Sequence, residues 1–117
     1  MANIDLIKLK KKSRILQIKF DDDLSADLDF EYLRVHSPSA EVRGHGKGQE
    51  ILQVGKQDVV LLEILPVGNY AVKLIFDDGH DSGIYTWNYL YELSINKDDY
   101  LKVYKSKVEI FNNQENL

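Results

Sequence analysis

The stretch DVVLLEILPVGNYAVKLIF, residues 58–76, decides the fold class of this chain. Its first part, residues 58–65, is a nearly continuous apolar run, which is typical of a central strand buried on both faces. The residues PVGN at 66–69 predict a turn, and YAVKLIF at 70–76 predicts a second strong strand. Because the two runs lie so close in sequence, we expect them to pair as a hairpin.

Three segments outside this hairpin also carry strand patterns. RILQIKF at 14–20 alternates apolar and polar residues and ends at three aspartates, which predict a turn. Residues 84–87 resume an aromatic strand after the Asp-Gly turn signal within 77–83. Residues 4–9 alternate loosely and are a further candidate, and the three lysines at 10–12 predict a solvated turn after them.

The C-terminal part of the chain predicts two helices. NYLYEL at 88–93 has helical spacing, and residues 98–111 follow a capping Asn96 with two aspartates in the first turn. The second helix carries one apolar stripe at steps of three and four, formed by Tyr100, Leu101, Tyr104, Val108 and Phe111. A short helical turn is expected at 30–33 with Asp27 or Asp29 as its cap, and residues 37–49 predict a loop.

These elements predict an α+β fold, a small mixed, mainly antiparallel β-sheet with two short helices towards the C-terminus. A chain of 117 residues fits a single domain, residues 1–117. The net charge of −4 argues against nucleic-acid binding, which needs a basic face. No apolar run approaches the roughly 20 residues of a membrane-spanning helix, and the N-terminus lacks the apolar core of a signal peptide.

The chain contains no cysteine. This composition excludes disulfides, thiolate zinc sites, cysteine-ligated iron–sulfur clusters and cysteine nucleophiles, and it fits a cytoplasmic protein. None of the residues two positions after His36, His45 and His80 is a carboxylate, so the ligand step of non-haem iron oxygenases is missing. Three aspartates surround His80 at 77–81, but acid–base catalysis there would need burial, and such turns are more often exposed. We expect no enzyme, no catalytic residue and no cofactor.

Three stretches together resemble the N-terminal domain of the gamma-butyrobetaine hydroxylase-like family. They are Leu33-Arg34 followed by SPSAEVRGHG at 37–46, then PVGNYAVKLIFDDGHDSGIY at 66–85, and TWNYLYEL at 86–93. The resemblance covers about residues 6–93 and leaves the C-terminal helix, about residues 97–111, outside it. It implies a mixed α/β or largely β fold and a domain of unassigned function, which also occurs alone in bacteria, as we expect here.

What the family implies about chemistry depends on four positions. In the hydroxylases this domain is a zinc-binding appendage, and the oxygenase chemistry belongs to a separate, larger domain. The zinc-binding relatives carry Cys-x-Cys-x-x-Cys after the Leu-Arg pair and the histidine of Asp-Gly-His. Here the cysteine positions hold Ser37, Ser39 and Val42, and only His80 remains. Serine is a poor zinc ligand and valine is none, so we expect a degenerate site without metal.

The function we expect is a non-enzymatic accessory or protein-interaction module whose partner is another protein. The candidate interaction surface consists of His36, Glu41, Arg43, His45 and His80. One alternative is an accessory role in iron–sulfur cluster or metal delivery, since the same domain is attached to some P-loop iron–sulfur carriers. The other is a small-molecule or metal-binding domain that uses His80 and the 36–45 loop, with His36, Glu41, His45 and His80 as substitute ligands.

Overall fold

The computed structural model describes residues 2–44, 46 and 48–115. Within them the chain forms six strands and four helices, which confirms the expected α+β class. In chain order these are β1 (Ile4–Lys10), β2 (Ile15–Phe20), β3 (Ser25–Asp29), α1 (Phe30–Val35), α2 (Ala40–Arg43), β4 (Leu61–Val67), β5 (Ala71–Phe76), β6 (Ile84–Thr86), α3 (Trp87–Ile95) and α4 (Lys97–Glu115).

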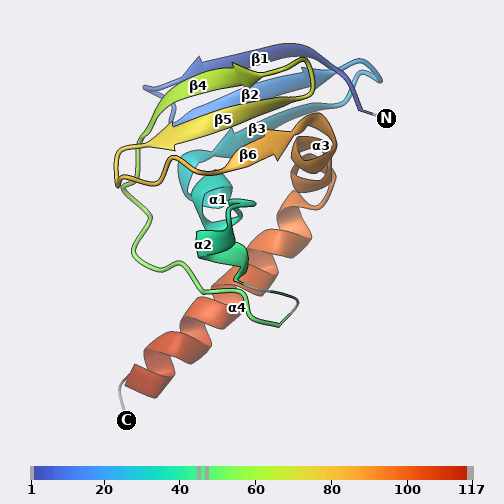
Figure 1. Cartoon of the computed structure of the whole chain (residues 1–117). Coiled ribbons are helices and arrows are strands. Elements are labelled where there is room, and N and C mark those ends of the chain that lie inside the picture. The colour runs from blue at the N-terminus through green and yellow to red at the C-terminus, as the bar shows by residue number, and fades with distance from the viewer. Residues whose placement is uncertain (1, 45, 47, 116–117) are drawn as a thin grey trace.

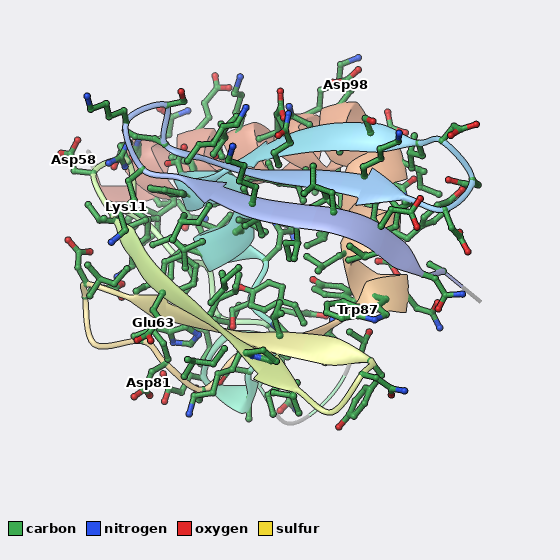
Figure 2. The ribbon with its side chains drawn as sticks, turned by 90° about the horizontal axis from the view of Figure 1, so that it is seen from above. Lys11, Asp58, Glu63, Asp81, Trp87 and Asp98 are labelled. Carbon is green, nitrogen blue, oxygen red and sulfur yellow. The ribbon has the colours of Figure 1, made fainter. Side chains whose placement is uncertain are left out.

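The strands form two three-stranded sheets, ordered β1-β2-β3 and β4-β5-β6, in which every neighbouring pair is antiparallel. Figure 2 shows the two sheets on opposite sides of a layer of side chains. This layer is the core: alternate residues of the middle strands β2 and β5 point into it, and they are fully or almost fully buried. The residues from these two strands are Leu16, Ile18, Phe20, Val72, Leu74 and Phe76.

Strand β4 corrects one expectation. The apolar run at 58–65 predicted a central strand buried on both faces, but β4 lies at the end of its sheet and starts at Leu61. Leu62 and Leu65 are 44% and 37% exposed. The strand also continues through Pro66, where a turn was expected, because an end strand has one row of backbone groups without a partner strand and tolerates a missing N–H.

Residues 25–35 form a strand and then a helix. Strand β3 pairs with β2 in the register Leu16↔Leu28, and α1 follows it directly. Of the two expected caps, Asp29 is the one used: its Oδ1 accepts a hydrogen bond of 2.7 Å from the backbone N–H of Tyr32. The expected loop at 37–49 contains the short helix α2, which Ser39 caps.

The two C-terminal helices differ in length and in how they lie against the sheets. Helix α3 is capped by Thr86, and Trp87, expected at the end of a strand, begins it. The Trp87 indole N–H donates a hydrogen bond of 2.8 Å to the carbonyl of Asn69, which ties α3 to the turn after β4. Helix α4 is 19 residues long, not short, and its second half runs beyond the sheets past α2 (Figure 1). None of the helices in the described part of the chain is long and apolar enough to cross a membrane.

Candidate functional site

A chain of hydrogen bonds joins α2 to the turn between β5 and β6. Ser37 Oγ lies 2.7 Å from His80 Nε2, and His80 Nδ1 lies 3.0 Å from Glu41 Oε2. Beside this chain, the hydroxyls of Ser39 and Ser82 lie 2.7 Å apart. These hydrogen bonds bring together side chains that are separated by 39 or 43 positions in the sequence. We call this group the serine–histidine cluster: Ser37, Ser39, Glu41, His80 and Ser82.

The local sequence explains why these side chains meet. Ser39 Oγ accepts a hydrogen bond from the backbone N–H of Glu41, which starts α2 and directs Glu41 towards His80. Helix α2 ends at Gly44, which has a φ of 70°, and a Cβ there would lie 2.1 Å from the carbonyl oxygen of Gln49. Only glycine therefore fits at the end of this helix.

The cluster has the hydrogen-bond sequence of a serine hydrolase, serine to histidine to acid, but its serine is not accessible to a substrate. When His80 is neutral with the proton on Nδ1, this atom donates to Glu41 and Nε2 accepts from Ser37, as in a Ser-His-acid triad. However, Ser37 is 1% exposed, and a Cβ on Gly83 would lie 2.5 Å from its Oγ. This hydroxyl is therefore almost completely shielded from solvent. In contrast, the acid of the cluster is open to solvent, because the Glu41 side chain is 69% exposed.

The aspartates before His80 hold the turn in place. Asp78 Oδ2 accepts hydrogen bonds from Arg34 Nε at 2.9 Å and Lys56 Nζ at 2.8 Å. Burial raises the pKa of Asp78, but these two hydrogen bonds and one from the backbone N–H of His80 outweigh it and hold the pKa at about 2. Asp77 Oδ1 accepts from the backbone N–H of Val60. Both carboxylates are therefore occupied by structural hydrogen bonds.

The residues present do not fit the zinc ion that the resemblance implies for the relatives. Ligand atoms of tetrahedral zinc lie about 2.0–2.3 Å from the metal and hence roughly 3.3 Å or more from each other. Ser37 Oγ and His80 Nε2 lie 2.7 Å apart, which is a direct hydrogen bond. Val42 is buried and has no donor atom. In the described part of the chain no group of three or more His, Asp or Glu side chains is placed to hold a metal ion.

The expected interaction surface is divided between two places. Glu41 and His80 belong to the serine–histidine cluster, whereas His36 and Arg43 line a neighbouring cleft. His36 Nδ1 lies 2.8 Å from the carbonyl of Tyr32, and burial is the largest cause that lowers the pKa of His36. The expected residue His45 lies outside the described residues.

This cleft, which we call the α4 cleft, has a volume of about 680 Å³ and lies between α4, α2 and the segment 48–53. Its aromatic wall residues were not expected at a site: Tyr89, Tyr100, Tyr104 and Phe111. The sequence signal was a second stripe on α4, offset from the one identified above, in which Tyr100, Val103, Lys107 and Ile110 follow one another at steps of three and four.

Comparisons with known proteins found a matching family model and similar solved structures. The family model described as gamma-butyrobetaine hydroxylase-like, N-terminal, matches residues 7–91. One protein solved in solution by NMR is 50% identical with a TM-score of 0.80, over 93% of this chain and 86% of that chain. Another is 46% identical with a TM-score of 0.81, over 96% and 83%. A search of curated proteins found no match.

A crystal structure is also similar. It is a protein of unknown function from Acidithiobacillus ferrooxidans that belongs to the DUF971 family. It is 38% identical to this chain with a TM-score of 0.65, and the similarity covers 78% of this chain and 91% of that chain.

Proposed function

This chain belongs to the gamma-butyrobetaine hydroxylase-like N-terminal family, and we propose that it is a non-catalytic accessory module that binds a partner protein. The docking surface is the exposed side of α2, with Glu41 and Arg43. One observation carries this proposal: the serine–histidine cluster is closed at Ser37 and open at Glu41. A hydrolase would need the opposite arrangement.

The cluster gives α2 a rigid support, which favours binding. Ser39 caps the helix and pairs with Ser82, and Glu41 is held by His80, so the backbone of α2 is fixed before a partner arrives. A surface that is ordered in advance loses less conformational entropy on binding. The charged side chains of α2 then supply electrostatic complementarity.

The test is capture of a partner from lysate of the source cells with three variants of the tagged chain. Glu41→Gln keeps an acceptor for His80 but removes the charge, and Arg43→Gln removes the cation. Lys102→Gln is the matched control, because Lys102 is exposed on α4 and lines neither the α4 cleft nor α2. We expect one protein to be retained by the wild type and the control, and to be bound at least about fivefold more weakly by the α2 variants.

Other outcomes discriminate between the functions. If the wild type retains no protein, or if the α2 variants retain it unchanged, the proposal is wrong. If the retained protein is a P-loop iron–sulfur carrier, the metal-delivery role gains support. Hydrolysis of p-nitrophenyl acetate that disappears in Ser37→Ala but persists in the Lys102→Gln control would show that the cluster is catalytic.

A further inference from the structure

The tyrosine hydroxyls in the walls of the α4 cleft already donate their hydrogens within the protein. Tyr89 Oη donates to the carbonyl of His36 at 2.6 Å, and Tyr104 Oη donates to the carbonyl of Gln53 at 2.6 Å. The ring of His36 stacks on Tyr100 with its centroid 5.7 Å away. What these residues present to the cleft is therefore mainly ring surface.

The same hydrogen bonds hold the cleft open at a fixed width. Tyr104 belongs to α4 and Gln53 to the opposite wall, 51 positions away, so their hydrogen bond joins the two walls directly. Tyr89 similarly attaches α3 to the end of α1 through the carbonyl of His36. A cavity that is formed in advance binds a small molecule without the cost of ordering its walls.

The charge in the cleft is opposite to that of the chain. Two cations, Arg43 and Lys107, and one carboxylate, Glu50, line it, although the whole chain has a net charge of −4. The Arg43 guanidinium lies over the Tyr89 ring, 4.8 Å from its centroid. Neither cation forms an ion pair with a carboxylate among the side chains that the structure describes. An anion in the cleft would meet both of them.

We infer that the α4 cleft binds a small, flat, apolar molecule that carries one anionic group. The volume of about 680 Å³ is that of a small-molecule site. The tyrosine and histidine rings receive the flat body, and Lys107 and Arg43 receive the carboxylate, sulfonate or phosphate. The cleft shares Arg43 with the docking surface proposed above, whereas Lys107 belongs to the cleft alone, so Lys107→Gln tests this inference separately from the partner protein.

The test uses anilinonaphthalene sulfonate as the anionic probe and uncharged phenylnaphthylamine as its counterpart. Fluorescence titration gives the affinity, and NMR shift changes of the labelled chain give the location. We expect the sulfonate to bind once per chain and to shift Val103, Tyr104 and Ile110. Lys107→Gln should weaken the binding of the sulfonate about threefold to fivefold, as expected for one exposed charge, and leave the affinity for the uncharged probe unchanged. Lys102→Gln, the matched control on the other side of α4, should change neither.

A second variant tests the cleft by adding a negative charge to it. Val103 is 52% exposed, so Val103→Asp should fold normally and place a negative charge in the cleft. We expect Val103→Asp to weaken the binding of the sulfonate more than the binding of the uncharged probe. The inference is overturned if the shift changes lie outside the cleft, if both lysine variants behave alike, or if the uncharged probe binds the wild type as tightly as the sulfonate does.

Discussion

His80 is the residue on which the serine–histidine cluster depends, because it is 3% exposed and both ring nitrogens have partners. A buried ring with two hydrogen bonds contributes to stability without being free for chemistry. Replacing it with alanine would leave the hydroxyl of Ser37 buried with one partner fewer.

We predict that the purified chain binds no zinc tightly. Ser37 and Ser39 are poor ligands, Val42 is none, and both nitrogens of His80 are engaged. Elemental analysis after dialysis tests this, and His80→Ala should lower the free energy of unfolding by about 1–3 kcal/mol without any change in metal content. A stoichiometric transition metal that is lost in His80→Ala would contradict the prediction.

Asp78 should make the stability of the fold depend on pH in the acid range. Its pKa is about 2 against an ordinary 3.8, so the folded state prefers the charged carboxylate. The stabilisation is therefore complete above the ordinary pKa and is lost as the pH falls from about 4 towards 2. In urea unfolding, Asp78→Asn should cost about 1–2 kcal/mol near neutral pH, and the difference from wild type should shrink across this window. Parallel pH curves for the two chains would refute this.

Among the elements, α4 is attached to the rest of the chain by partly exposed residues. None of its described side chains is fully buried, and the hydrogen bond from Tyr104 to Gln53 holds the middle of the helix to the segment opposite it. We predict that Tyr104→Phe costs about 1 kcal/mol of stability and speeds amide exchange in the second half of α4. Tyr70→Phe, at an exposed tyrosine, is the control. Unchanged exchange in Tyr104→Phe would show that the helix is held by other contacts.

The elements were predictable from sequence where one residue pattern was strong. The alternation in 14–20 and the apolar run at 70–76 gave β2 and β5, which are the middle strands of the two sheets. Strand β3, SADLD, has one buried residue, Leu28, and is defined by its pairing with β2, so its own sequence gave no signal. The position of β4 at a sheet end also depends on tertiary pairing, which the apolar run alone does not encode.

The site was predictable only in part, for a similar reason. The resemblance placed Ser37, Ser39 and His80 at related positions, and the structure brings Ser37 and His80 into contact. The meeting of Glu41 with His80 joins segments 39 residues apart, and no local pattern reports such a distance. The α4 cleft was missed because Tyr104 and Lys107 look like ordinary positions of an amphipathic helix until segment 48–53 lies opposite them.

At the scale of the whole molecule, we predict no oxygenase activity on betaines or any other substrate coupled to α-ketoglutarate. Such chemistry needs an iron held by two histidines and a carboxylate, with an open position and a pocket for the oxo acid. In the described residues, His36 and His80 point to different partners, Tyr32 and Glu41. The assay adds iron, α-ketoglutarate and oxygen and follows succinate. Turnover well above an iron-only blank that disappears in His80→Ala would overturn this prediction.

The free edge of β4 affects how readily the chain aggregates at high protein concentration. An end strand with exposed leucines is a template on which another copy of the same strand can add, which is how amyloid-like aggregates begin. Two features oppose such growth here: the register irregularity between Leu61 and Glu63, and Pro66, which has no N–H to offer an incoming strand. We predict that Pro66→Thr keeps the fold but raises thioflavin fluorescence and light scattering at high concentration, whereas Thr86→Ser on β6 does not. Equal behaviour of the two chains would mean that proline is not what keeps this edge from polymerising.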